Sequence, residues 1–288
     1  MRRVLGMLAA TVLALGATVA QAAETRLGVI APRGEAAATA QWGEFARYLE
    51  GAIGQPVRLV PVVLAKLEQA IANGEVDYAL VNPVQGVSVK ERFGMPFLAS
   101  LVLPSGSQFG GVIIANPKAG IAKGADLKGK KVIGLSKNAA GAFLFQAHEL
   151  KKAGVRVPED VAVYQEAKKQ DDVVLAVKAG VMDAGFVRSG VLEGMIQEGK
   201  IKPGDVAIID KKANFPQGVS TALYPEWYLV AVNKADTAVA ARIKAAALAL
   251  KPDSDAAKMA DIKGFVEPVD PGQTLEMMRD MKVPPFDK

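Results

Sequence analysis

The chain of 288 residues contains no cysteine and only one histidine. Without cysteine there are no disulfides, no thiolate metal ligands, no cysteine nucleophile and no cysteine for a lipid anchor. The histidine, His148, lies among charged residues in the middle of a predicted helix, which indicates a solvated helix face. Nucleophilic sites of the Ser-His and Cys-His types are therefore excluded. The sequence predicts a protein that is not an enzyme and that holds no metal and no cofactor.

Several sequence motifs are missing as well. No HExxH, no Walker A loop and no GxGxxG follows a predicted strand. There is no basic stripe interleaved with aromatic residues, so nucleic acid is not an expected partner. The formal net charge is +5, and removing Arg2 and Arg3 leaves 33 basic against 30 acidic residues. This mild positive bias is compatible with a small anionic ligand.

The beginning of the chain is typical of an export signal. Two arginines precede an apolar run over 4–19, and Ala-Gln-Ala follows, ending at residue 22. A membrane anchor is the weaker alternative, because the run is short for a spanning helix and no later segment offers about 18 uninterrupted apolar residues. Residues 1–23 are thus predicted to be a signal peptide, and 24–288 a soluble periplasmic protein without a lipid anchor.

An internal repeat organises the mature chain. Residues 73–83 and 179–190 are related by an offset of 106 positions, and both contain a helix end, Gly-x-Val/Met-Asp and an apolar run. A polar residue follows each run, Asn82 in the first copy and Arg188 in the second. The chain is therefore predicted to contain two related α/β halves, with the ligand between these two residues, since ligands bind beyond the carboxyl ends of strands in open α/β sheets.

The repeat also aligns two acidic residues, Asp77 and Asp183. They precede the apolar runs and so lie at the opposite strand ends from Asn82 and Arg188. We expect them to be turn or strand-start residues and not a pair of catalytic carboxylates.

Short apolar runs alternate with helical patterns, which predicts parallel sheets with right-handed crossovers. The expected strands are 26–31, 57–63, 77–81, 97–103, 111–115, 132–135, 161–164, 183–187, 206–210 and 228–233. The expected helices are 36–53, 64–73, 139–152, 171–179, 237–250 and 274–280.

Two extended passages, at 104–107 and near 221–225, are predicted to join the halves. They divide the mature chain into a first lobe, 24–107 plus 222–288, and a second lobe, 108–221. A hinge of two segments lets such lobes close around a ligand.

Three candidate ligand groups follow predicted strands. Arg33 could clamp an oxyanion with its fork of donors, and a surface arginine is an equally good interpretation. Asn82-Pro83 is either a ligand contact or a simple turn. Arg188 is the strongest candidate, because a buried strand should direct it into the cleft; its alternative is an ion pair with Glu193.

The loop 136–141 opens a predicted helix, where free backbone N–H groups and the positive helix end form an anion site. Its expected contacts are Ser136, Asn138, Ala140 and Gly141. Plain N-capping by a loop side chain is the alternative. Gln108 and Tyr224 flank the two passages and either line the cleft or serve hinge geometry.

These motifs resemble one known family. In chain order they are Gly-Val-Ile-Ala-Pro-Arg-Gly (28–34), Asn-Pro (82–83), Phe-Gly-Gly (109–111), Asp-Leu-Lys-Gly (126–129), Asp-Ala-Gly-Phe-Val-Arg (183–188) and Tyr-Pro-Glu-Trp (224–227). Their order and spacing are similar to type II periplasmic binding proteins of the phosphate/phosphite/phosphonate-binding family. The branch most resembled also supplies the input domains of tetrathionate-type sensor histidine kinases.

The resemblance implies a Venus-flytrap fold, a monomer, and capture of a small anionic solute. Its implied partner in the inner membrane is an ABC permease or, alternatively, a sensor histidine kinase. Phosphonate binders of the family carry a Ser/Thr-rich loop where this chain has 136–141 with a single hydroxyl. Sulfur and metalloid oxyanions therefore stay open as ligands beside phosphonate and phosphite.

Overall fold

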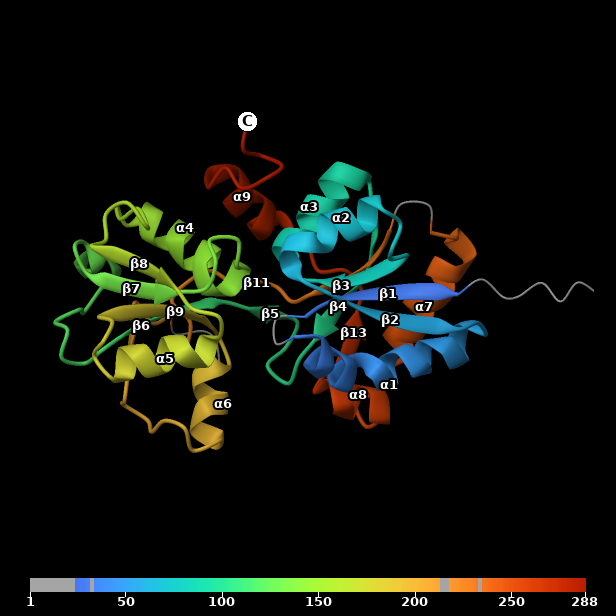
Figure 1. Cartoon of the computed structure of the whole chain (residues 1–288), viewed down its shortest axis with the longest axis horizontal. Helices are drawn as coiled ribbons and strands as arrows, with labels where there is room; N and C mark the ends of the chain where they lie inside the picture. The colour runs from blue at the N-terminus through green and yellow to red at the C-terminus, as the bar shows by residue number, and fades with distance from the viewer. Residues whose placement is uncertain (1–23, 32–33, 213–217, 233–234) are drawn as a thin grey trace, which may run out of the picture.

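The computed structural model describes residues 24–31, 34–212, 218–232 and 235–288. The predicted signal peptide, residues 1–23, lies outside the described residues. The chain forms two α/β lobes that lie side by side along the longest axis of the molecule (Figure 1). This is the architecture that the sequence predicted.

The first lobe contains a six-stranded sheet in the order β13-β4-β12-β3-β1-β2. Its strands are β1 (Thr25–Ile30), β2 (Val57–Val62), β3 (Tyr78–Val81), β4 (Phe97–Val102), β12 (Tyr228–Ala231) and β13 (Gly264–Val266). The strand β1 pairs in parallel with β2 and β3, whereas β12, β4 and β13 extend the sheet with antiparallel pairs. Every residue of β3 is buried, as expected for a continuous apolar run at the centre of a covered sheet.

Helices cover both faces of this sheet. One face packs against α1 (Glu35–Ile53), α7 (Thr237–Ala249) and α8 (Asp255–Ala260), and the other against α2 (Leu67–Ala72) and α3 (Pro83–Phe93). A 3₁₀ turn over Leu64–Lys66 leads into α2. The predicted helix 36–53 is confirmed, and Trp42, Phe45 and Leu49 are all buried on one side of α1.

The second lobe contains a five-stranded sheet in the order β10-β6-β9-β7-β8. Its strands are β6 (Gly111–Ala115), β7 (Lys131–Gly134), β8 (Val163–Glu166), β9 (Ala184–Arg188) and β10 (Ala207–Ile209). Its helices are α4 (Phe145–Lys152), α5 (Gln170–Lys178) and α6 (Val191–Gln197), with a 3₁₀ turn over Gly124–Leu127 and a π-helical turn over Ala140–Leu144. The helix α4 packs on one face of the sheet, and α5 and α6 on the other.

The internal repeat seen in the sequence corresponds to a repeat in topology. The order β2-β1-β3, followed by an antiparallel neighbour, recurs as β8-β7-β9 with the antiparallel neighbour β6. The two aligned aspartates have the same role in both copies. Asp77 accepts a hydrogen bond of 2.8 Å from the backbone N–H of Arg26, and Asp183 one of 2.8 Å from that of Lys131. Both are therefore strand-start residues, as expected.

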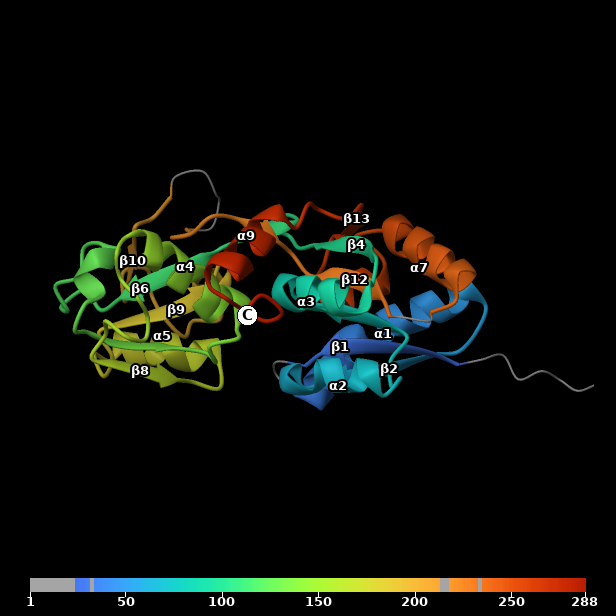
Figure 2. The ribbon, with the colours of Figure 1, turned by 90° about the horizontal axis from the view of Figure 1, so that it is seen from above.

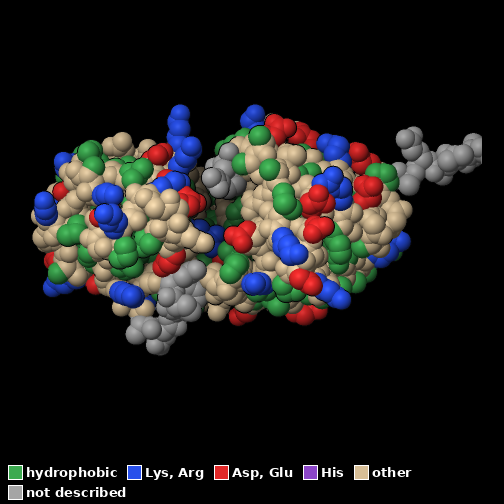
Figure 3. All heavy atoms as spheres, turned by 90° about the horizontal axis from the view of Figure 1, so that it is seen from below, with side chains coloured by type: hydrophobic (Ala, Val, Ile, Leu, Met, Phe, Trp, Pro, Cys, Tyr) green, Lys and Arg blue, Asp and Glu red, His purple; other side chains and the backbone are tan. Residues whose placement is uncertain are grey.

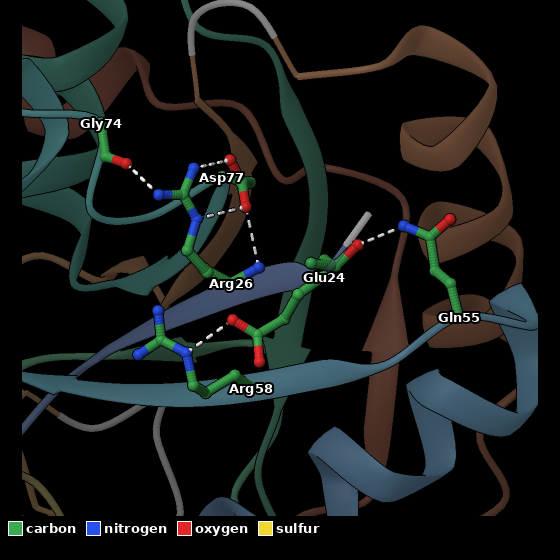
Figure 4. A network of polar contacts seen from close by, with 7 residues as sticks. Glu24, Arg26, Gln55, Arg58, Gly74 and Asp77 are labelled. Carbon is green, nitrogen blue, oxygen red and sulfur yellow. Dashed lines mark hydrogen bonds and ion pairs between the residues drawn. The ribbon is translucent and has the colours of Figure 1, made fainter. Parts of the chain in front are cut away.

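The first copy of this contact carries an additional ion pair (Figure 4). The Arg26 guanidinium donates to both carboxylate oxygens of Asp77, at 2.9 Å from Nε and 2.5 Å from Nη2. Nearby, Arg58 on β2 donates to Glu24 at 2.8 Å. The network joins the N-terminal ends of β1, β2 and β3, away from the predicted ligand site.

Two short strands connect the lobes, β5 (Gln108–Phe109) and β11 (Tyr224–Pro225), and they pair with each other in antiparallel fashion. The second passage is also fixed to the second lobe, because the Thr221 hydroxyl accepts a 2.9 Å hydrogen bond from the Gly111 N–H. The two-segment hinge is thus a small two-stranded sheet.

The last helix, α9 (Gly272–Asp280), lies between the lobes in both views (Figures 1 and 2). Its Met277 and Met278 are fully buried in the same hydrophobic cluster as Phe145 of α4 and Val87 of α3. The C-terminal segment therefore packs against both lobes.

The structure corrects some local predictions. The helices α3 and α6 were not predicted, and neither were α8 and β13. The expected helix 139–152 is divided, because Ala142 has non-helical angles and a π-helical turn precedes α4. The expected solvated position of His148 is wrong: the side chain is 3% exposed and faces α9, with Nε2 3.3 Å from Asp280 Oδ2.

Candidate functional site

Two cavities meet between the lobes. The first has a volume of ≈ 180 Å³ and is lined mainly by apolar side chains of β1, α1 and β4, together with Gln41, Arg188 and Glu226. The second has a volume of ≈ 370 Å³ and contains more polar groups. Both are bordered by Ile30, Arg188 and Trp227. Seen from below, the surface is hollowed between the lobes, with basic side-chain atoms at the hollow (Figure 3).

Arg188 makes several contacts at this junction. It ends β9, where it pairs with Gly111, and its backbone N–H donates to Gln170 Oε1 at 2.7 Å. Its guanidinium carbon lies 4.3 Å from the centre of the Phe109 ring, a cation–π contact. The side chain is 23% exposed. A mostly covered guanidinium with remaining donors suits an oxyanion.

The alternative predicted for Arg188, an ion pair with Glu193, is wrong, because Arg188 pairs with a different glutamate. Arg188 Nη2 donates instead to Glu226 Oε1 at 2.5 Å. Glu226 is completely buried, and burial raises the pKa of its carboxyl, although the Arg188 charge and hydrogen bond oppose this. Its other oxygen, Oε2, has no side-chain hydrogen-bond partner in the part of the chain that the structure describes. The site therefore contains a buried ion pair.

The loop before α4 reaches this junction without a capping side chain. Ala139 precedes the π-helical turn, and no side chain hydrogen-bonds to the first N–H groups of that turn. The alternative interpretation of this loop, N-capping by Ser136 or Asn138, is therefore not found among the described residues. A Cβ on Gly141 would lie 2.6 Å from the Phe109 ring and 3.1 Å from Arg188 Cβ, so only glycine permits this close approach.

The buried side chain of Gln146 supports the π-helical turn through hydrogen bonds. Gln146 Nε2 donates to the carbonyl of Gly141 at 2.9 Å and to that of Val187 at 2.8 Å. These bonds join the π-helical turn to the end of β9, one residue before Arg188. Sequence reasoning did not identify Gln146, because an amide in a helical pattern carries no signal of such a long-range contact.

The structure brings five of the predicted site residues together. Around the second cavity lie Asn82, Ser136, Ala140, Gly141 and Arg188. Asn82 has a structural role in addition, since its Oδ1 accepts from the N–H groups of Val84 and Gln85 and so caps α3. The Asn-Pro pair therefore starts a helix and is not a simple turn.

The remaining predicted residues lie elsewhere. Pro83 is buried in the first turn of α3. Asn138 borders a separate cavity of ≈ 510 Å³, and Gln108 belongs to the hinge strand β5. Tyr224 is 1% exposed and stacks on Phe145, so the structure does not bring it into the cleft. Arg33 lies outside the described residues.

Several lining residues were missed. Trp42 and Trp227, the only two tryptophans of the chain, both border the first cavity. Glu226 and Trp227 were noted only as members of a motif beside the hinge. Lys168 and Gln170 border the second cavity. Both residues follow β8, a strand after which the sequence analysis named no candidate. Among the described residues, no group of three or more His, Asp or Glu side chains could hold a metal ion.

Two α/β lobes, a two-stranded hinge and cavities between the lobes define the class of type II solute-binding proteins. The model of the family described as "ABC transporter, phosphonate, periplasmic substrate-binding protein" matches residues 27–271. The chain belongs to this family. The family resemblance predicted from the sequence is confirmed, and the family is one of substrate-binding proteins rather than enzymes.

The chain is also similar to part of a longer protein. It is 28% identical over 224 residues to the tetrathionate sensor histidine kinase TtrS of Salmonella typhimurium. The match covers 75% of this chain but only 38% of the kinase. This relative agrees with the predicted closeness to the sensor branch.

Solved structures share the fold at low sequence identity. PhnD1 from Prochlorococcus marinus in complex with methylphosphonate aligns with a TM-score of 0.73 at 16% identity, covering 90% of this chain and 98% of that one. The periplasmic aliphatic sulphonate binding protein SsuA from Escherichia coli aligns with a TM-score of 0.60 at 15% identity, covering 91% and 94%. Among the described residues, no helix is long and apolar enough to cross a membrane.

Proposed function

We propose that this protein captures a small oxyanion between its lobes in the periplasm and delivers it to an ABC transporter. The observation that carries the proposal is the position of Arg188 at the junction of both cavities. Arginine offers several N–H donors in a fixed fork, which matches the oxygens of an oxyanion. The uncapped first turn at Ala140 and Gly141 supplies further N–H groups beside it.

The hinge and the second lobe support the same function. Arg188 and Gly141 belong to the second lobe, whereas Asn82 belongs to the first, so a ligand held by both groups favours closure. Arg33 comes three residues after Ile30, the last residue of β1, and is a further proposed contact from the first lobe. We also propose that the protein acts as a monomer.

A second function is proposed beside the first, because a specific observation favours it. The similarity to a tetrathionate sensor histidine kinase covers three quarters of this chain. In this alternative, the closed ligand-bound form docks on a membrane histidine kinase and reports the solute instead of delivering it. Both functions use the same site and the same closure.

The experiment is a thermal-shift screen of residues 24–288 against phosphate, phosphite, alkylphosphonates, sulfate, thiosulfate, tetrathionate, selenite and arsenite, with carboxylates and amino acids as the contrast set. A ligand at 100 times its Kd stabilises the fold by about 2.7 kcal/mol, a shift of a few degrees in Tm. A hit confined to oxyanions supports the proposal. If no oxyanion raises Tm while a carboxylate or an amino acid does, the proposal is overturned.

Transport and sensing are then separated in cells. Deleting the gene should abolish uptake of the identified ligand if the protein serves a permease. It should leave uptake intact and abolish ligand-dependent phosphorylation of a response regulator if the protein serves a kinase.

A further inference from the structure

The last helix, α9, connects the two lobes in addition to the hinge strands (Figures 1 and 2). The segment that leads into it is fixed to the sheet of the first lobe. The backbone N–H of Val269 donates to Ser100 Oγ at 2.9 Å, and the Tyr228 hydroxyl donates to the Val269 carbonyl at 2.7 Å. Ser100 lies on β4 and Tyr228 on β12. The chain therefore enters α9 from a fixed point in the first lobe.

The other end of α9 is bound to the second lobe. Lys151 on α4 donates to Asp280 twice, at 2.7 Å to the backbone carbonyl and at 2.7 Å to Oδ1. His148 Nε2 lies 3.3 Å from Oδ2 of the same residue. Between the two ends, Met277 and Met278 are completely buried in the hydrophobic cluster that also contains residues of α3 and α4. Residues 269–284, called the strap below, thus span both lobes.

The strap ends beside the space between the lobes. Val283 and Pro284 border the cavity of ≈ 510 Å³, together with Leu64 of the first lobe and Ser136 of the second. Leu64 and Ser136 also border the second candidate ligand cavity. The strap therefore adjoins the space that a movement of the lobes opens or closes.

The contacts of the strap are formed while the lobes leave cavities of ≈ 180 and ≈ 370 Å³ between them. A rotation that closes these cavities moves α4, and Lys151 with it, relative to the fixed point at Val269. Hydrogen bonds weaken once donor and acceptor are more than about 3.2 Å apart, so closure strains or breaks the contact at Asp280. This contact therefore stabilises the open arrangement relative to the closed one.

We infer that the strap holds the lobes of the unliganded protein open and thereby lowers the affinity for the ligand. This rests on the proposed function, because closure on a ligand is the movement that the strap opposes. Weakening the contact between Lys151 and Asp280 should make closure easier and binding tighter. The competing interpretation is that α9 moves with the second lobe as one rigid body. In that case loss of the contact changes neither closure nor affinity.

The test uses the absence of cysteine, because two introduced cysteines are then the only sites for spin labels. Lys66→Cys lies directly before α2 in the first lobe and Lys169→Cys directly before α5 in the second, and both lysines are exposed. Their neighbours Leu64 and Lys168 border the second cavity. The distance between the labels, measured by pulsed electron paramagnetic resonance, therefore reports the separation of the lobes.

Lys151→Met removes both hydrogen bonds to Asp280 and keeps a good helix former at the end of α4. Without ligand, shorter label distances should gain population, since an exposed ion pair shifts such an equilibrium by up to about fivefold. Asp280→Ala removes the carboxylate from the other side and should have the same effect. Lys152→Met removes the neighbouring exposed lysine and is the matched control for the loss of charge.

Affinity is the second measurement. Phosphate, methylphosphonate, sulfate and tetrathionate are the probes, titrated by calorimetry into the wild type and the variants without labels. We expect Lys151→Met to bind up to about fivefold more tightly than Lys152→Met. Any general loss of attraction for anions affects both variants equally, so their comparison isolates the strap.

Where a probe binds, tighter binding by Lys151→Met than by Lys152→Met supports the inference. Equal affinities of these two variants overturn it and leave the proposed function standing. Where the wild type binds none of the probes, the proposed function fails, and the label distances test the inference without it. A shift toward shorter distances in Lys151→Met then supports the inference, and distributions equal to those of Lys152→Met overturn it.

Discussion

Tyr224 and Phe145 stack face to face, with ring centroids 3.5 Å apart and planes inclined by 8°. The pair joins the hinge strand β11 to α4 of the second lobe, and Tyr224 is 1% exposed. Its hydroxyl lies 3.4 Å from Nδ1 of His148. The contact makes Tyr224 a part of the hydrophobic core beside the hinge.

Tyr224→Ala is therefore expected to lower the free energy of unfolding by about 3 kcal/mol or more, as for other buried aromatic truncations. Tyr224→Phe should cost no more than about 1 kcal/mol, because only the hydroxyl contact is lost. Urea denaturation measures both. If Tyr224 instead contacted the ligand, Tyr224→Phe would weaken binding with little effect on stability.

Replacement of Arg188 tests the anion site. Arg188→Lys keeps the charge but loses the fork, and we expect ligand affinity to fall at least about tenfold. Arg188→Ala should abolish binding and also destabilise the protein by about 3 kcal/mol, because it leaves the buried Glu226 without its partner. Arg242→Ala, which removes an exposed arginine on α7, is the control for loss of charge. Unchanged ligand affinity in Arg188→Lys and Arg188→Ala would place the ligand elsewhere.

Filling the first cavity should interfere with the ligand. Ala37 on α1 borders this cavity, whereas the neighbouring Ala36 is exposed and does not. Ala37→Leu is expected to weaken binding by about tenfold, a typical cost of overpacking, and Ala36→Leu to leave it unchanged. Calorimetric titration of the hit from the screen measures both, and equal affinities would show that the ligand avoids this cavity.

Ligand binding should compact the protein, because two hinge strands connect the lobes and the proposed contacts come from both lobes. Small-angle scattering with and without saturating ligand is the measurement. An identical radius of gyration in both states would contradict closure on the ligand.

Stability should fall in mild acid because of His148. Burial lowers the pKa of its imidazole, with a further contribution from Lys152 that Asp280, Glu149 and Glu276 oppose. A histidine whose folded pKa lies below its ordinary value of 6.5 takes up its proton more readily in the unfolded chain. The contribution of neutral His148 to the free energy of unfolding is therefore fully present above pH 6.5, and it is lost progressively as the pH falls toward the folded pKa.

The measurement is the free energy of unfolding between pH 7.5 and pH 5.5, roughly the range in which an ordinary histidine titrates. We expect a decrease in the wild type and a smaller one in His148→Gln. Equal slopes in the two proteins would show that His148 does not cause the decrease.

Much of the fold was predictable from the sequence, because it depends on local patterns. The apolar runs at β1, β3, β6 and β9 and the spacing of Trp42, Phe45 and Leu49 reflect burial on one face or both, which periodicity reports directly. The missed helices α3 and α6 are short or start with residues that also favour turns. Asn82-Pro83 is equally a turn signal and a cap followed by a first-turn proline.

The sequence by itself determined the two related halves, the family and the choice of Arg188, since each rests on residues in a fixed order along the chain. Only the tertiary structure decided which groups contact Arg188. Its partner Glu226 is 38 residues away, and Phe109 and Gly141 come from two further segments. Which side chains share a buried place depends on how strands and helices pack, and no local pattern encodes that. The complete burial of Glu226 beside Arg188 follows from that packing alone.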